Sequence, residues 1–211
     1  MNIFKKNVGV YGSNSYIISS DNGDAVIIDV GGNADDLYDY IKKEKLNLKA
    51  ILLTHGHFDH VLGVNALRKL TGAPSYISKD DYEMTQKTDF MLNDKMRNYI
   101  DEPINIDHTI DKEGTMKFGN IEVNIIKTPG HTKGGLTYQI GDGLFVGDTI
   151  FFHSVGRSDL YGGDENELID SVNKLLALEG NYKIYPGHSM NTTSDEERAN
   201  NPYVNVKWSM Y

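Results

Sequence analysis

Apolar and polar positions change their spacing several times along the chain, from the dense apolar runs of strands to the longer period of helices. Residues 14–20 and 24–29 are rich in strand-forming side chains, and the Asp-Asn-Gly triplet at 21–23 is typical of a tight turn. Apolar residues within 34–45 recur with helical spacing. The N-terminal part therefore predicts a β-hairpin followed by an amphipathic helix.

The same two patterns continue towards the C-terminus. A continuous apolar run at 50–53 predicts a strand buried on both faces, and leucines after residue 60 predict a helix that Gly72 ends. Further strand-like runs lie at 104–110, 121–127, 135–140, 143–147 and 182–185. An amphipathic helix is predicted around 168–176, and Ser194 with Glu197 has the spacing of a capping box for a short last helix.

Strands that interleave with helices place the chain in the α/β class, with either one mixed sheet or a pair of sheets and helices outside. Periodicity does not choose between these two arrangements. Since 211 residues are enough for one sizeable core, we expect a single domain over residues 1–211. Residues 79–103 carry methionines and aromatics without one clean period. We expect a short helix and a loop there, which covers a site or contributes to a homodimer contact.

Composition narrows the chemistry. The chain has no cysteine, which excludes disulfides, thiolate ligands and a cysteine nucleophile, so any metal must bind histidine and carboxylate. A net charge of −9 argues against a nucleic-acid partner. No apolar run has the length of a membrane span, and the N-terminus lacks the apolar stretch of a secretory signal. We therefore expect a cytoplasmic protein, a monomer or homodimer, with no membrane partner.

Four potential metal ligands lie within six residues, directly after the predicted strand at 50–53. They are His55, His57, Asp59 and His60. Chance places this pattern in roughly one chain in a thousand of such composition. The first two histidines, two apart on an extended loop, can hold one ion, while the other two ligands turn toward a second. Neutral imidazole and carboxylate suit zinc, and also iron or manganese, so the motif predicts two divalent metal ions with zinc as the first expectation.

Three further candidate ligands each follow a strand-like run and a small or turn-forming residue. They are His131, Asp148 and His188. Because loops converge at strand ends in sheets covered by helices, we expect these side chains to reach the same place as the motif at 55–60. His108 and His153 lack this context, so we interpret them as surface or outer-shell residues.

The segments 54–60, 128–132, 147–149 and 186–188 resemble, in order and spacing, the metal motifs of the metallo-β-lactamase superfamily. The resemblance implies an αββα sandwich, in which two mixed β-sheets pack face to face with helices on the outside. It also implies how the ligands are shared between two ions. His55, His57 and His131 would bind one ion, Asp59, His60 and His188 the other, and Asp148 would bridge them.

Other segments are similar to the short bacterial glyoxalase II-like, or hydroxyacylglutathione hydrolase-like, branch. These segments are 29–32, 156–164 and 192–202. Asp148 stands where the commonest broad-spectrum lactamases carry cysteine, which disfavours a lactamase. We expect no helical C-terminal extension of the kind that holds glutathione in full glyoxalase II. The resemblance therefore implies hydrolysis of a small-molecule thioester, with the acyl group and thiol carrier left open.

In the expected mechanism, a hydroxide that bridges the metals attacks the acyl carbon. Asp59 would bind metal and orient this hydroxide, while Asp148 would bridge the ions. Arg157 is the predicted substrate contact because its guanidinium can bind a carboxylate through two hydrogen bonds, although a structural bond to Asp159 is an equal alternative. Tyr161 is a second candidate for the pocket wall.

A different reaction class remains open at this point. A mononuclear iron oxygenase that resembles persulfide dioxygenase would need only two histidines and one carboxylate, here His55, His131 and Asp148. Hydrolysis of a lactone or a phosphodiester are further alternatives.

Overall fold

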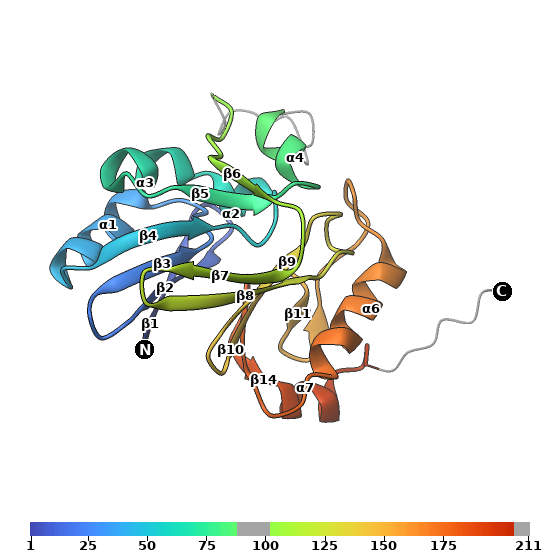
Figure 1. The fold of residues 1–211 in the computed structure, drawn as a ribbon. Helices are drawn as coiled ribbons and strands as arrows, with labels where there is room; N and C mark the ends of the chain where they lie inside the picture. The colour runs from blue at the N-terminus through green and yellow to red at the C-terminus, as the bar shows by residue number, and fades with distance from the viewer. Residues whose placement is uncertain (88–101, 205–211) are drawn as a thin grey trace.

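The structure is a computed structural model that describes residues 1–87 and 102–204. Two six-stranded sheets pack face to face, with helices on their outer sides (Figure 1). The first sheet contains, in spatial order, β1 (Asn2–Val8), β2 (Ser13–Ser19), β3 (Asp24–Ile28), β4 (Asn47–Leu52), β5 (Ser75–Ser78) and β6 (His108–Ile110). The second contains β14 (Thr192–Thr193), β13 (Lys183–Pro186), β10 (Gly143–Gly147), β9 (Leu136–Ile140), β8 (Ile121–Lys127) and β7 (Gly114–Phe118). Both sheets combine parallel and antiparallel pairs, so the predicted αββα sandwich of two mixed sheets is confirmed.

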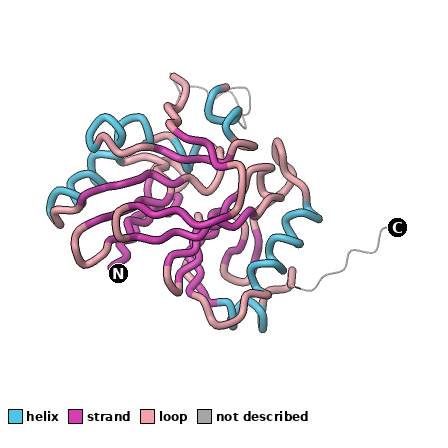
Figure 2. Tube along the Cα trace, in the orientation of Figure 1, coloured by secondary structure: helices cyan, strands magenta, loops and turns pink. Residues whose placement is uncertain are grey.

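Helices cover the outer face of each sheet, and the tube view separates them from the strands by colour (Figure 2). The helices are α1 (Ala34–Lys43), α2 (Phe58–Val61), α3 (Val64–Thr71), α4 (Tyr82–Gln86), α6 (Glu165–Leu176) and α7 (Ser194–Asn200). A small hairpin of β11 (Ile150–Phe151) and β12 (Ser154–Val155) lies beside the second sheet. Across the described ranges, no helix combines the length and apolarity that crossing a bilayer needs.

Strand β4 shows why the sandwich has more than one apolar layer. Ala50 and Leu52 point into the layer between the two sheets, whereas Ile51 and Leu53 point into the layer under α1 and α3. A third layer packs α6 against the second sheet. The prediction of a strand buried on both faces is confirmed, and the strand delivers its last residues directly to the motif at 55–60.

Most predicted elements are confirmed, but the strand expected over 104–110 is wrong for its first half. Only His108–Ile110 pair with β5. The preceding backbone forms no regular ladder, and side chains take up several of its hydrogen bonds: Asn65 Oδ1 accepts from Asn105 N at 2.7 Å, and Gln86 Nε2 donates to the carbonyl of Ile104 at 2.9 Å. These polar side chains occupy backbone groups that would otherwise bond to a neighbouring strand.

The predicted capping box at the last helix is also displaced by one residue. Thr193 is the N-cap, and its hydroxyl accepts from Glu196 N at 3.2 Å. Ser194 is already helical. Glu197 is fully buried, and its carboxylate accepts from Thr192 Oγ1 at 2.6 Å instead of closing a box.

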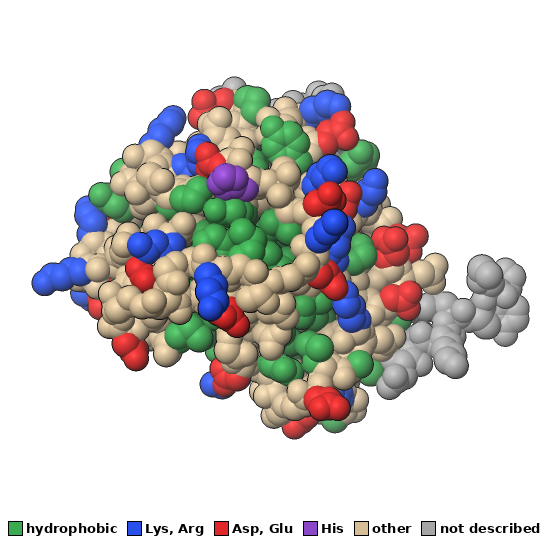
Figure 3. Space-filling model, viewed as in Figure 1, with side chains coloured by type: hydrophobic (Ala, Val, Ile, Leu, Met, Phe, Trp, Pro, Cys, Tyr) green, Lys and Arg blue, Asp and Glu red, His purple; other side chains and the backbone are tan. Residues whose placement is uncertain are grey.

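An apolar hollow opens where the edge strands β6 and β7 meet, and hydrophobic side chains gather at the centre of this face (Figure 3). Tyr76, Ile110, Met116 and Ile125 contribute to its lining. His108 lies on its rim and stacks on Tyr76, with ring centres 4.7 Å apart. His108 is therefore a surface residue, as expected, and belongs to this hollow.

Candidate metal centre

The loops that carry the predicted ligands leave strand ends at one edge of the sandwich. The six-residue motif follows β4, and single ligands follow β8, β10 and β13. Strands β10 and β13 are parallel, and two antiparallel pairings through β9 give β8 the same direction. A backbone hydrogen bond of 2.8 Å from Leu136 N to Thr54 O ties the motif loop to the second sheet. This topology brings ligands that are distant in sequence to one place.

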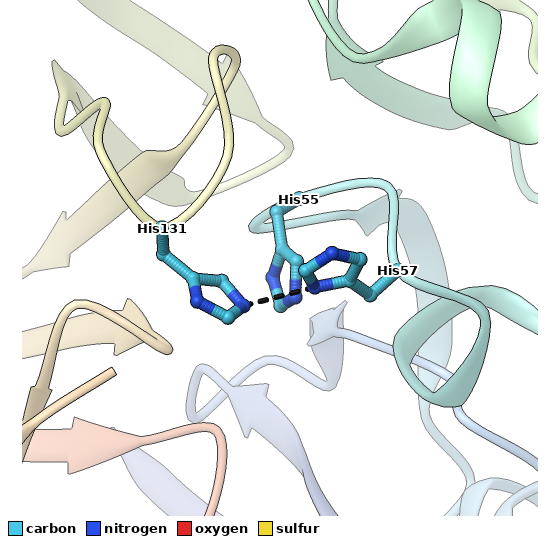
Figure 4. Close-up of side chains that lie close together, drawn as sticks. All are labelled: His55, His57 and His131. Atoms are coloured by element: carbon cyan, nitrogen blue, oxygen red, sulfur yellow. Dashed lines mark hydrogen bonds between the residues drawn. The ribbon is translucent and has the colours of Figure 1, made fainter. Parts of the chain in front are cut away.

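Three histidines form the first group of predicted ligands, and their rings point toward one another (Figure 4). This three-histidine group consists of His55, His57 and His131, whose ligand atoms lie within 4.8 Å of one another. Nδ1 of His57 lies 2.9 Å from Nε2 of His131. Nε2 of His55 is buried and has no hydrogen-bond partner among the described residues. Three imidazole nitrogens that converge, one of them buried without a hydrogen-bond partner, have the donor chemistry of a metal site.

A second group lies beside the first and contains a carboxylate. This Asp59 group consists of Asp59, His60 and His188, again with ligand atoms within 4.8 Å of one another. Nε2 of His188 lies 3.1 Å from Oδ2 of Asp59 and 3.3 Å from Nε2 of His60. Both predicted sets of three are thus brought together in space.

Asp148 lies between the two groups. Its Oδ2 is 3.5 Å from His131 Nε2 and 3.6 Å from His188 Nε2, while its Oδ1 is 3.5 Å from His60 Nε2. That Oδ1 atom is buried and, within the described chain, accepts no hydrogen bond. Gly187 leaves it room, because a Cβ there would lie 2.2 Å from Oδ1. Two orphaned buried ligand atoms, one on His55 and one on Asp148, fit divalent cations held by both groups.

Hydrogen bonds behind the ligands set the orientation of the imidazoles. His131 Nδ1 donates to the carbonyl of Arg157 at 2.6 Å, and His60 Nδ1 donates to Asp29 Oδ2 at 2.8 Å. His55 Nδ1 lies 3.0 Å from Thr54 Oγ1, whose own hydroxyl donates to Asp29 Oδ2. In each of these rings Nδ1 has a partner, so the neutral imidazole carries its proton on Nδ1 and offers the Nε2 lone pair to a metal ion.

Burial keeps His55 and His57 of the three-histidine group neutral. It lowers the pKa of His57 to about 3, helped by His131, and holds the pKa of His55 well below the ordinary imidazole value. Neutral imidazole is the form that binds a metal ion. His55 and His57 therefore present nitrogen lone pairs at neutral pH.

Carboxylates dominate the second group. Burial alone would lower the pKa of His60, but Asp148, Asp59 and Asp29 outweigh it and raise that pKa to about 10. Burial works against ionisation of Asp59, yet His60 and His188 hold its pKa below the usual range. This half of the site requires positive charge, which a proton on His60 or a divalent cation supplies.

Comparison with known proteins agrees with this geometry. A family model described as the metallo-β-lactamase superfamily matches residues 8–188. The chain belongs to the metallo-β-lactamase superfamily. The resemblance inferred from the motifs is thereby confirmed.

Several superfamily members are similar to the chain over nearly its whole length. Hydroxyacylglutathione hydrolase GloC of Haemophilus influenzae is 35% identical, and the match covers 98% of this chain and 100% of that protein. Among solved structures, the BLEG-1 B3 metallo-β-lactamase is 32% identical with a TM-score of 0.88, covering 97% and 100% of the two chains. The protein TTHA1623 in a di-iron-bound form is 31% identical with a TM-score of 0.83, covering 95% and 100%. The expectation that disfavours a lactamase stays a prediction.

In this chain, a pocket of about 330 Å³ opens onto the predicted metal-binding side chains. Its wall beyond the ligands consists of Tyr11, Phe58, Arg157 and Leu160. The rings of Tyr11 and Phe58 meet edge to face, with centres 5.4 Å apart. The pocket therefore offers an aromatic and aliphatic wall beside the metal centre.

The two predicted substrate contacts lie in different places. Arg157 lines the pocket, and its guanidinium donates to both carboxylate oxygens of Asp159 at 2.7 Å. Tyr161 is 53% exposed and does not line the pocket within the described residues. His153 lies outside the ligand cluster, where its Nε2 bonds to Glu196 at 2.7 Å. The roles of Arg157 and Tyr161 stay predictions.

Three residues at the site were missed in the sequence. In the sequence, Tyr11 lies between Gly9 and Gly12, a pattern typical of a surface turn. Asp29 is the last residue of the predicted run 24–29, and the sequence indicated no individual role for it; in the structure it follows β3, as other ligands follow their strands. Asp81 is buried behind the three-histidine group and carries no local signal at all. The predicted helix in 79–103 is present as α4, while 88–101 lies outside the described residues.

Proposed function

We propose that the protein is a metal-dependent hydrolase that cleaves the acyl bond of a small thioester. The observation that carries the proposal is the convergence of seven ligand side chains in two groups joined by Asp148. Similarity to a hydroxyacylglutathione hydrolase over the whole length supports a thioester substrate. A di-iron form of a similar protein supports two metal ions per chain. We propose zinc as the metal, with iron or manganese accepted by the same ligands.

The three-histidine group, the Asp59 group and Asp148 would hold divalent cations, and these ions would supply an activated water at neutral pH and a Lewis acid for the acyl carbonyl. The side chains of the protein orient the attacking water and shield the substrate. Asp59 lines the pocket, so its carboxylate can accept a hydrogen bond from the attacking water and orient it. Tyr11, Phe58 and Leu160 exclude water on one side of the substrate. No serine or cysteine nucleophile is required.

Arg157 has a double role in this proposal. Its carbonyl holds His131, and its side chain lies at the pocket wall with Asp159 as a counter-ion. Because that carboxylate already occupies the guanidinium fork, a substrate carboxylate must compete with Asp159. We propose that Arg157 contacts a carbonyl or amide of the substrate and not a free carboxylate.

A substrate panel tests the function. The purified metal-loaded protein is assayed on S-lactoylglutathione and other acyl thioesters, a lactone, a phosphodiester, a β-lactam and, with oxygen uptake recorded, glutathione persulfide. We expect the highest kcat/KM on a thioester, loss of activity with a chelator, and recovery with zinc. Asp59→Asn should lower kcat strongly, whereas the exposed Asp39→Asn should not. Highest activity on the β-lactam, or oxygen uptake with one iron per chain, would contradict the proposal.

A further inference from the structure

We infer that Asp81 is a positioning residue for the three-histidine group, because its carboxylate joins the two loops that carry these ligands. This inference rests on the metal-dependent function proposed above. Oδ2 of Asp81 accepts from Gly56 N at 2.9 Å, and Gly56 lies between two of the histidines. The same carboxylate accepts from Thr132 Oγ1 and from Gly134 N, both at 2.7 Å, directly after the third histidine. One buried side chain therefore connects both halves of the group.

Asp81 lies at the start of helix α4, but its side chain does not cap this helix. Asp81 is the N-cap residue of α4, where an aspartate side chain usually accepts a hydrogen bond from the first turn of its own helix. No such side-chain bond is formed. All hydrogen bonds to the carboxylate among the described residues come from the ligand loops instead. Helix capping therefore does not explain why a carboxylate is buried here.

Both loops also pack against the start of α4 at a distance that only glycine permits. A Cβ at Gly56 would lie 2.9 Å from Met84 Cβ and 3.0 Å from the Asp81 carbonyl oxygen. A Cβ at Gly134 would lie 2.6 Å from Asp81 Cγ. Because the loops rest on the same short segment, a change at Asp81 is transmitted to both of them.

The Asp59 group is held by different side chains. Asp29 bonds to His60, and the loop that carries His188 is fixed by Asn14, whose Nδ2 donates to the Pro186 carbonyl at 2.8 Å. Loss of Asp81 should therefore act selectively. It should weaken metal binding at the three-histidine group and leave the Asp59 group intact.

Zinc titration of the full chain in competition with a chromophoric chelator tests this selectivity. The wild-type protein should give two dissociation constants, and His57→Ala identifies the one that belongs to the three-histidine group. In Asp81→Asn the amide directs its own N–H groups at N–H donors, so we expect that constant to rise about 10- to 100-fold and the other to stay unchanged. The control is Asp80→Asn, which removes an ion pair with Lys127 and should leave both constants unchanged.

The possible results separate this inference from the proposed function. If the wild-type protein fails to bind zinc, the proposed function is overturned, and the inference with it. If the wild-type protein binds two ions and Asp81→Asn changes neither constant, or both equally, only the inference is overturned. If circular dichroism shows that Asp81→Asn does not fold, Thr132→Val is tested in its place. This variant removes one of the three hydrogen bonds to the Asp81 carboxylate and should raise the dissociation constant of the three-histidine group by a smaller factor. No change there would also overturn the inference.

Discussion

Asp29 receives three hydrogen bonds in the buried space behind the metal centre. They come from Thr54 N and Thr54 Oγ1, both at 2.7 Å, and from His60 Nδ1 at 2.8 Å. Since Thr54 Oγ1 also lies beside His55 Nδ1, a single carboxylate orients one histidine in each group. At the scale of residues, the orientation of the predicted ligands therefore depends on side chains outside the set of seven.

Asp29→Asn should weaken metal binding in both groups. The asparagine amide has one acceptor oxygen, so it cannot accept all three hydrogen bonds that Asp29 receives. When its NH2 group takes the place of Oδ2, the His60 imidazole is driven toward the tautomer with its proton on Nε2, where metal should bind. We expect metal affinity to fall about 10- to 100-fold. Competition titration measures the change, and Asp36→Asn, at an exposed ion pair with Lys6, serves as control. Unchanged affinity in Asp29→Asn would refute this orienting role.

The sequence singled out the ligand residues because their signal is local, whereas the residues behind them have no local signal. His55 to His60 are neighbours in one loop. Asp29 and Thr54 are 25 positions apart, and Asp81 and Thr132 are 51 positions apart. Only the packing of the two sheets makes these contacts, so no spacing rule could find them.

At the scale of elements, the ends of β4 and β10 meet closely beneath the centre. Gly147, the last residue of β10, has a φ of 53°, and a Cβ there would lie 2.5 Å from Thr54 Oγ1. Thr54 in turn holds Asp29 and His55. The glycine therefore permits both the left-handed turn into Asp148 and the contact between the two sheets.

Gly147→Ala should reduce both stability and metal binding. Gly72 offers a matched control, because its φ is 72° and a Cβ there would meet nothing within 4 Å. Gly72→Ala should lose about 1–2 kcal/mol of unfolding free energy from backbone strain alone. Gly147→Ala should lose roughly 2–5 kcal/mol, because Thr54 must also move. Urea unfolding measures the unfolding free energy of the two variants, and equal losses in Gly72→Ala and Gly147→Ala would contradict the contact with Thr54.

Elements with strong periods were predictable and weak ones were not. The hairpin of β2 and β3 and the helix α6 follow clear patterns and are confirmed. Strands β5 and β7 were missed because one has only four residues and the other is largely exposed at a sheet edge. The choice of two packed sheets over one mixed sheet came from the resemblance, because periodicity describes single elements and not their partners.

At the scale of the whole molecule, the metal centre joins the two sheets. The motif at 55–60 comes from the first sheet, while His131, Asp148 and His188 come from the second. Ions bound to ligands of both sheets would resist separation of the sheets. Binding only to the folded state stabilises it by mass action.

Removal of metal should therefore lower thermal stability. Free metal at 1,000 times Kd contributes about 4 kcal/mol, which for a chain of this size corresponds to roughly 8–16 °C in Tm. Differential scanning calorimetry of the loaded and the dialysed, chelator-treated protein measures the shift, and added zinc should restore it. An equal Tm after verified metal removal would show that the two sheets do not depend on metal.

The measurement that tests the account most directly is metal content per chain. The protein is produced in medium supplied with zinc, iron and manganese, purified without chelator, and analysed by inductively coupled plasma mass spectrometry against protein concentration. The account predicts close to two divalent ions per wild-type chain, falling to about one in His57→Ala. A well-folded wild-type protein without bound metal would contradict it.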